Sequence, residues 1–195
     1  PLSTTDFNPI VQRIKQSGAD TVFAFFPAGA PTLGFMKSYI GNGLKEEGIG
    51  LISTGDLLTE PDLPALGDVA LGTQSTYHYS AAHDSPENKA FMEALEAVGA
   101  DTSKVTMAAV ASFDGAKLIY EMIEATGGEQ DPQTAVDAVK GMSWTSPRGP
   151  VSIDPDTRHI TQNVYLREVA KDGDRYINKE MRSFDAQPDW GLVGK

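Results

Sequence analysis

The sequence contains no cysteine among its 195 residues. This absence excludes a disulfide scaffold, a thiolate metal site and a thiol nucleophile. It does not fix the redox compartment, although it agrees with an oxidising one, where stray thiols are a hazard. Long hydrophobic runs are missing as well, since no apolar stretch approaches the length that spans a membrane. We therefore expect no membrane insertion.

Positive charge is scarce, with 16 Lys and Arg residues against 27 Asp and Glu residues and a net charge of −11. Affinity for nucleic acid comes from Lys and Arg that neutralise phosphates, so we expect no nucleic-acid partner. Glycine-rich phosphate motifs are absent, because the stretch 27–31 (PAGAP) matches neither nucleotide fingerprint. At 40% hydrophobic residues, the chain can form a sizeable core, as one domain or two small ones.

Patterns for catalysis and metal binding are also lacking. His78 and His83 are not at helical metal spacing, and no acidic third ligand is obvious. The stretch 112–115 (SFDG) lacks the flanking glycines of a nucleophile elbow. Glu121 and Glu124 belong to a solvated helix face rather than an acid/base pair. We therefore expect no catalytic residues, no metal and no cofactor.

The stretch from Ala19 to Asp56 predicts a strand, a helix and a second strand. Residues 21–26 (TVFAFF) form an uninterrupted β-branched and aromatic run, which predicts a strand buried on both faces. Pro31 suits the first turn of a helix, and Ile49–Ile52 forms the second short strand. Such a unit is right-handed with parallel strands, and ligands bind outside the carboxyl ends of such strands.

These strand ends carry the first candidate site residues, each with an alternative role. Asp56 could hold a ligand's ammonium or hydroxyl group, or it could cap the segment that follows. Phe26, with Pro27 and Ala28, could form a flat apolar wall with free backbone N–H groups, or Phe26 could be the last core residue of its strand. Tyr79, like its neighbour Tyr77, could contact a ligand or pack under a loop.

The remaining sequence predicts a change of architecture. Two successive helices interrupt the alternation of strands and helices, and a hairpin with a turn at 171–174 follows. The expected elements are a helix at 7–17 capped by Thr5 or Asp6, a strand at 71–79, helices at 86–98, 105–125 and 132–139, a strand at 151–153, hairpin strands at 163–169 and 175–184, and a mobile tail at 185–195. Because the chain starts on Pro1 and then on a helix, we expect processing or truncation with loss of a preceding strand.

Several segments, taken in order, resemble the type I periplasmic solute-binding proteins of ABC importers. The similar branch is the Leu/Ile/Val-binding, branched-chain amino acid receptor family, and the resemblance covers essentially the whole chain. It is carried by residues 5–15 (TDFNPIVQRIK), 19–23 (ADTVF), 52–56 (ISTGD), 67–72 (GDVALG), 77–80 (YHYS), 85–91 (SPENKAF), 149–154 (GPVSID) and 164–166 (VYL).

The resemblance implies an α/β receptor whose two lobes close over a small solute. On this pattern, residues 1–101 form the second lobe, a parallel-sheet three-layer lobe that is incomplete at its start. Residues 102–170 return to the first lobe, and residues 171–195 supply the crossing strand of a C-terminal β-hairpin and the tail. The core of the first lobe, which supplies donors to the solute's carboxylate in the family, is missing.

Carried over residue by residue, the resemblance implies a ligand site without catalytic groups. Gly55 falls where branched-chain receptors keep an acid for the solute's ammonium group, with Asp56 beside it. Phe113 and Asp114 fall near the hinge, where a side chain can touch the solute. The implied ligand-binding set is Phe26, Pro27, Ala28, Gly55, Asp56, Tyr79, Phe113 and Asp114.

The function implied is binding of a branched-chain amino acid or an aromatic carboxylate in the periplasm, with an importer permease as partner. A sensory or regulatory domain of the same fold is the alternative. A small-molecule enzyme using Asp56 or His83 is the less favoured reading, because the sequence offers neither an activated nucleophile nor a metal set.

Overall fold

The computed structural model describes residues 6–128 and 131–191, so Thr5 and residues 192–195 of the expected tail lie outside the described residues. Short 3₁₀ turns η1 (Gly55–Leu58), η2 (Gly67–Ala70) and η3 (Thr102–Lys104) connect the longer elements. The helices are α1 (Asn8–Ser17), α2 (Ala30–Gly41), α3 (Leu63–Leu66), α4 (Pro86–Ala97), α5 (Met107–Thr126) and α6 (Pro132–Ala138). The strands are β1 (Thr21–Ala24), β2 (Gly50–Thr54), β3 (Gln74–Tyr77), β4 (Ser143–Ser146), β5 (Gly149–Ile153), β6 (Ile160–Asp172) and β7 (Arg175–Gln187).

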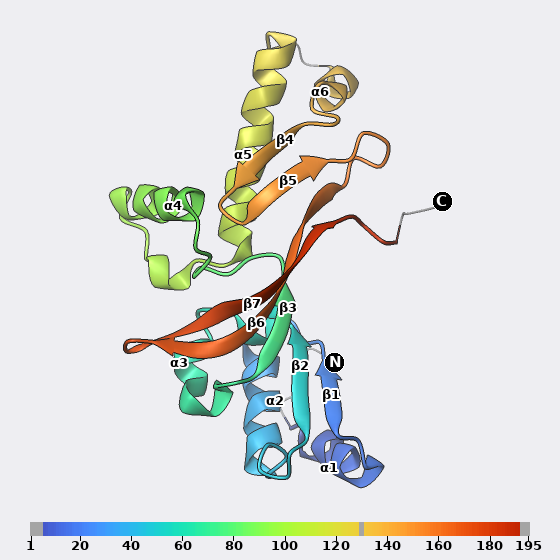
Figure 1. Cartoon of the computed structure of the whole chain (residues 1–195), viewed down its shortest axis with the longest axis vertical. Coiled ribbons are helices and arrows are strands. Elements are labelled where there is room, and N and C mark those ends of the chain that lie inside the picture. Colours follow the sequence, from blue (N-terminus) through green and yellow to red (C-terminus); the bar gives the residue numbers. More distant parts are fainter. Residues whose placement is uncertain (1–5, 129–130, 192–195) are drawn as a thin grey trace.

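The strands form one continuous sheet in the order β1-β2-β3-β6-β5-β4, with β7 also paired to β6. Strands β1, β2 and β3 are parallel, which confirms the strand–helix–strand unit, and the remaining pairs are antiparallel. β6 pairs with β5 through residues 160–162 and with β3 through residues 165–168. It therefore joins a lower part containing β1–β3 to an upper part containing β4 and β5 (Figure 1).

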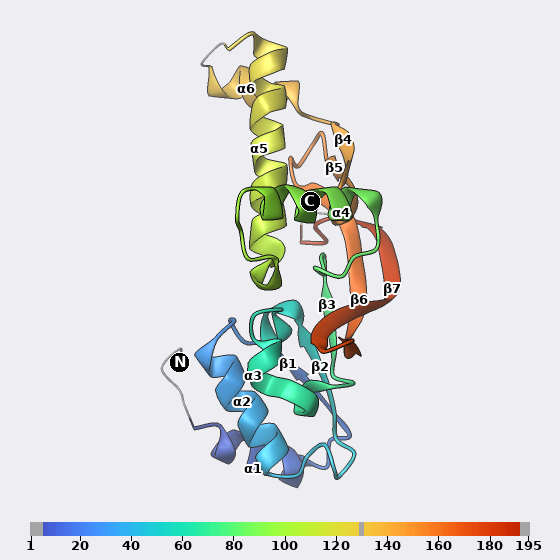
Figure 2. The same cartoon turned by 90° about the vertical axis from the view of Figure 1, so that its left-hand side faces the viewer.

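In the lower part, α1, α2 and α3 cover one face of β1–β3 (Figure 2). The core on this face contains Val11, Phe35, Met36 and Leu51, all buried. Within the described residues no helix covers the opposite face, so the layering is incomplete, as the sequence predicted.

The expectation that residues 21–26 form a strand buried on both faces was wrong. The strand ends at Ala24, and Phe23 and Phe25 are each 67% exposed. β1 lies at the edge of the sheet order, and only its helix-covered face is shielded, so alternate side chains remain exposed.

In the upper part, α4 and α5 share a second apolar core formed by Tyr79, Phe91, Val105 and Val110. Ser85 caps α4 by accepting a hydrogen bond from the Asn88 N–H at 3.1 Å, as the sequence predicted. α4 ends at Ala97, one residue before the expected end at Val98, and Val98 is exposed.

The β6–β7 hairpin turns at Gly173, whose φ of 59° suits a two-residue turn. The hairpin was expected, but it is longer than the sequence indicated. β7 continues to Gln187, which pairs with Gln162, so residues 185–187 are part of the sheet rather than a mobile tail. β4 was not expected, since its sequence (SWTS) has no run of apolar residues.

The expected division at residues 1–101, 102–170 and 171–195 remains a prediction. In the structure, α4 packs against α5 in the upper part although it precedes the expected boundary at Asp101. Among the described residues, no helix has the length and apolar character needed to cross a membrane.

A buried phenylalanine, Phe35, and an exposed one, Phe23, allow a direct test of this packing. Phe35 is 2% exposed, so Phe35→Ala should lower the free energy of unfolding by about 3–5 kcal/mol. Phe23→Ala, which removes an equal side chain from the uncovered face, should change it by less than about 1 kcal/mol in the 195-residue protein. Urea denaturation followed by circular dichroism measures both, and equal losses would contradict the described exposure.

Candidate functional site

The carboxyl ends of β1, β2 and β3 meet at one edge of the lower part, facing the upper part (Figure 1). Parallel pairing places residues 25–28, 55–56 and 77–78 side by side there, because each segment directly follows or ends its strand. Such an edge is the usual binding position in open parallel sheets.

Gly55 lies directly against the ring of Tyr77. A Cβ atom placed on Gly55 would lie 2.1 Å from Cγ of Tyr77 and within 2.6 Å of two further ring atoms. Real Cβ atoms do not approach other atoms so closely, so position 55 has no room for a side chain while Tyr77 keeps this position. At position 55, where branched-chain receptors are expected to keep an acid, the space for a side chain is therefore occupied by the Tyr77 ring of the neighbouring strand β3.

Asp56 and Tyr77 form the polar pair of this edge. The Tyr77 hydroxyl donates to Asp56 Oδ1 at 2.9 Å. Burial, together with this hydrogen bond and the charge of Asp56, raises the pKa of Tyr77 above its ordinary value, so the phenol stays protonated and keeps donating. Asp56 is half-buried and keeps further acceptor capacity for a ligand.

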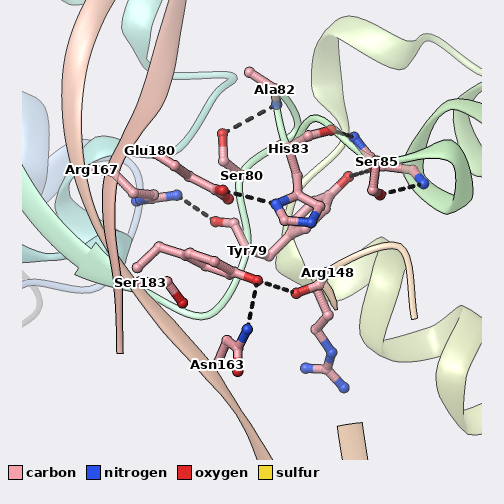
Figure 3. Close-up of polar contacts among 12 residues, drawn as sticks. Tyr79, Ser80, Ala82, His83, Ser85, Arg148, Asn163, Arg167, Glu180 and Ser183 are labelled. Atoms are coloured by element: carbon pink, nitrogen blue, oxygen red, sulfur yellow. Dashed lines mark hydrogen bonds and ion pairs between the residues drawn. The ribbon is translucent and has the colours of Figure 1, made fainter. Parts of the chain in front are cut away.

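Arg167 holds Tyr77 from the other side. Its guanidinium carbon lies 5.0 Å from the Tyr77 ring centroid, within cation–π range. Arg167 is fully buried, and its Nη1 donates to the Tyr79 carbonyl at 2.6 Å (Figure 3). Its Nη2 donates to Ser75 Oγ at 3.1 Å. Burial lowers the pKa of Arg167, and the nearby Glu60 partly opposes this effect.

Phe26 is partly buried and packs against the lower core, while its contact with a solute stays a prediction. Its ring stacks on Phe35 at 4.8 Å and meets Phe7 edge-on at 5.2 Å. Pro27 and Ala28 are exposed in the loop before α2, and the Pro27 carbonyl accepts a hydrogen bond from Thr32. These three residues lie at the expected edge, with the loop rather than the Phe26 ring facing solvent.

Tyr79 is also a core residue in this structure. It is almost completely buried in the second apolar core, and its hydroxyl donates to Asn88 Oδ1 at 2.9 Å. A contact between Tyr79 and a solute stays a prediction, and the structure shows the tyrosine packing under the 80–85 loop.

Asp114 is buried and holds three internal partners. Its carboxylate accepts from Trp144 Nε1 at 3.0 Å, from Ser146 Oγ at 2.9 Å and from Arg148 Nη2 at 2.8 Å. These bonds fix the β4–β5 turn on α5. The adjacent Phe113 is 45% exposed, and its ring centroid lies 5.1 Å from that of Phe91. Phe113, and not Asp114, therefore has an exposed surface that a solute could contact.

The structure adds His78, Arg148 and Arg167 to the residues near the site. Burial is the main effect that lowers the pKa of His78, to about 4, and the charges of Arg148 and Arg167 act in the same direction. His78 is therefore neutral at pH 7, with its ring 4.7 Å from that of Tyr77. A signal for Arg167 existed in the sequence, because it occupies a buried position in the alternating strand that contains Tyr165 and Val169.

The segments that cross between the two parts are joined by polar contacts (Figure 3). Ser80 Oγ donates to the Asn178 carbonyl at 2.5 Å, and His83 Nδ1 lies 2.8 Å from Glu180 Oε2. Across residues 6–128 and 131–191, no three His, Asp or Glu side chains gather as a metal site would require. The site thus offers an aromatic surface, a carboxylate and a neutral imidazole.

Comparison with known proteins shows a consistent set of relatives. A family model described as periplasmic binding protein matches residues 1–174. The Leu/Ile/Val-binding protein homolog 6 of Brucella melitensis biotype 1 is 59% identical over 194 residues, which are 98% of this chain and 50% of that protein.

Two similar solved structures are solute-binding proteins of ABC transporters from Rhodopseudomonas palustris. The one from strain HaA2, in complex with p-hydroxybenzoic acid, is 65% identical, with a TM-score of 0.97 over 100% of this chain and 53% of that chain. The one from strain BisB5, in complex with 3,4-dihydroxybenzoic acid, is 41% identical, with a TM-score of 0.85 over 98% and 52%. The chain thus spans about half the length of these relatives.

The contact between Gly55 and Tyr77 can be tested by a double-mutant cycle. Gly55 is not among the glycines with positive φ, so an added methyl group meets the Tyr77 ring without backbone strain. Gly55→Ala should lower the free energy of unfolding by about 1–3 kcal/mol, and should cost less when Tyr77→Ala is also present. Gly41→Ala, which meets nothing within 4 Å, serves as the control. Additive losses would contradict the close approach.

The half-buried His78, whose pKa is lowered mainly by desolvation, should make stability depend on pH. The ordinary His pKa is about 6.5, so below that pH the unfolded chain binds a proton that folded His78 does not bind until about pH 4. The free energy of unfolding should therefore decrease as the pH is lowered from about 6.5 to about 4. His78→Gln should remove this part of the pH dependence. The exposed His159→Gln is the control, and identical pH profiles for both variants would contradict the burial of His78.

Proposed function

The chain belongs to the periplasmic binding protein family, and we propose that it serves in a solute-binding receptor of an ABC importer whose solute is a small aromatic carboxylate. Receptors of this kind bind without turnover, and the relatives are binding proteins rather than enzymes. The expected periplasmic location and the permease partner form part of the same proposal.

The observation that carries the choice of solute is the contact of Gly55 with the Tyr77 ring. An amino acid solute needs an anionic partner for its ammonium group, and position 55 has no space for a carboxylate. The neighbouring Asp56 already accepts the Tyr77 hydroxyl, and it can accept a phenolic hydroxyl in addition. The relative from strain HaA2, 65% identical, was solved with p-hydroxybenzoic acid, which has both an aromatic ring and such a hydroxyl.

In this proposal the solute's ring lies near Tyr77 and the exposed loop at residues 27–28, with its hydroxyl toward Asp56. Phe113 on α5 faces the solute from the upper part. The neutral His78 adds an uncharged polar group beside Tyr77. The resemblance implies that donors of the first lobe hold the solute's carboxylate.

Binding proceeds by closure of two lobes around the solute. The crossing segments are the link from β3 to α4 and strands β6 and β7, which run between the upper and lower parts (Figure 1). A solute that contacts both parts favours the closed arrangement by its differential contacts. A sensory domain of the same fold would use the same closure, and binding of a signalling protein instead of a permease would identify it.

Titration calorimetry on the intact receptor tests the proposed solute. We expect 4-hydroxybenzoate to bind at least about tenfold more tightly than leucine. Asp56→Ala should weaken 4-hydroxybenzoate by about 1.5–3 kcal/mol, because a hydrogen bond to a charged group is lost. It should affect benzoate much less, since benzoate has no hydroxyl group.

Asp20→Ala removes an exposed carboxylate after α1 and should leave both affinities unchanged. Tighter binding of leucine would contradict an aromatic solute. An equal loss for benzoate and 4-hydroxybenzoate in Asp56→Ala would contradict the role of Asp56.

A further inference from the structure

A cavity of about 710 Å³ lies between α4 and the tip of the β6–β7 hairpin, and none of the proposed solute-site residues lines it. Its upper wall comes from α4, including Asn88, Met92 and Glu93. Its lower wall comes from the hairpin segment 174–178, and the loop 81–84 closes it toward the crossing segments. The volume is typical of sites for small organic molecules.

Carboxylates dominate the charge of this cavity. The five that line it are Glu60, Asp84, Glu93, Glu96 and Asp174. Its two permanent cations are already paired, Lys89 with Asp84 at 3.1 Å and Arg175 with Asp172 at 3.1 Å. Within residues 6–128 and 131–191, Glu93 and Asp174 form no ion pair. The excess of negative charge favours a cationic occupant.

A buried acceptor in the wall points in the same direction. Asn178 is completely buried, and its Nδ2 donates to the Leu58 carbonyl at 2.8 Å and to Glu60 Oε1 at 3.1 Å. Its Oδ1 accepts no hydrogen bond from the part of the chain that the structure describes. A buried acceptor without a donor costs about 1–3 kcal/mol, so a ligand that brings N–H donors would be stabilised there.

The cavity also has an apolar lining, with Met92 on one wall and Pro64, Tyr176 and Ile177 on the other. A bare metal ion or a fully polar cation would leave these surfaces unused. We propose that this cavity is a second binding site, which takes an organic cation consisting of an ammonium group on an apolar ring or chain.

The position of the cavity links such a ligand to the arrangement of the two parts. Met92 packs against the upper core and Tyr176 against the lower core, so a ligand touching both bridges them. The contact of His83 with Glu180 (Figure 3) and the contact of Ser80 with Asn178 lie beside it. If the receptor works by closure, as the proposed function holds, the cation should also change solute affinity.

Calorimetry on the intact receptor, with 4-hydroxybenzoate present in excess, tests the site. The probe is 2-phenylethylamine, and the matched neutral molecule is 2-phenylethanol. The amine should bind at least about tenfold more tightly than the alcohol, because only the amine compensates the carboxylates. The double variant Glu93→Gln/Asp174→Asn should weaken the amine about five- to tenfold while leaving 2-phenylethanol unchanged.

The double variant Glu124→Gln/Asp20→Asn removes two exposed charges elsewhere and should bind the amine like the unmodified protein. Equal binding of amine and alcohol, no binding of the amine, or an equal loss in this control would overturn the site. Displacement of 4-hydroxybenzoate by the amine would place the amine in the solute site and would also overturn it. A receptor that ignores 4-hydroxybenzoate but binds the amine would refute the proposed solute alone.

Discussion

The buried guanidinium of Arg167 is the interaction on which the centre of this structure depends. A buried charge is costly unless it is paired and hydrogen-bonded. Arg167 Nη1 donates to the Tyr79 carbonyl, Nη2 donates to Ser75 Oγ, and the Glu60 carboxylate lies 3.8 Å from Nη1, while Nε has no partner among the described residues. These partners tie β6 to β3 at the point where β3 leaves the lower part. Because β6 also pairs with β5, the sheet continues through β6 from the lower part to the upper part, with Arg167 at its contact with β3.

The geometry at the strand ends follows from this anchor. Arg167 lies over one face of Tyr77, and Gly55 lies against the ring, so the phenol is held where its hydroxyl meets Asp56. A larger residue at position 55 would displace the ring, and loss of the guanidinium would leave the ring without its charged neighbour. The preference that we propose for an aromatic solute thus comes from backbone and core packing as well as from a carboxylate at the site.

The sequence predicted the elements whose signals are local. Prolines, glycines and alternation located the parallel unit, the cap of α4 and the hairpin turn. The rule for strand ends pointed to Asp56, and the family resemblance pointed to Gly55. The prediction of burial was wrong at Phe23 and Phe25, because burial depends on whether another layer covers that face of the sheet. The apolar character of these two residues is the same in either case. The sequence also could not show that the Asp114 carboxylate accepts hydrogen bonds from Trp144, Ser146 and Arg148, which lie about thirty residues away in the chain.

The contrast between the two cores and the segments that join them bears on the proposed closure. Each core is held by close-packed apolar side chains, which lose much free energy when they separate. The crossing segments are joined by hydrogen bonds such as those of Ser80 with Asn178 and of Tyr165 with the Arg148 carbonyl. A hydrogen bond can be exchanged for one with water or another group at a net cost of about 0.5–1.5 kcal/mol. Bending should therefore concentrate at the crossing segments while both cores move as rigid units, and a ligand beside those segments acts where the molecule is easiest to deform.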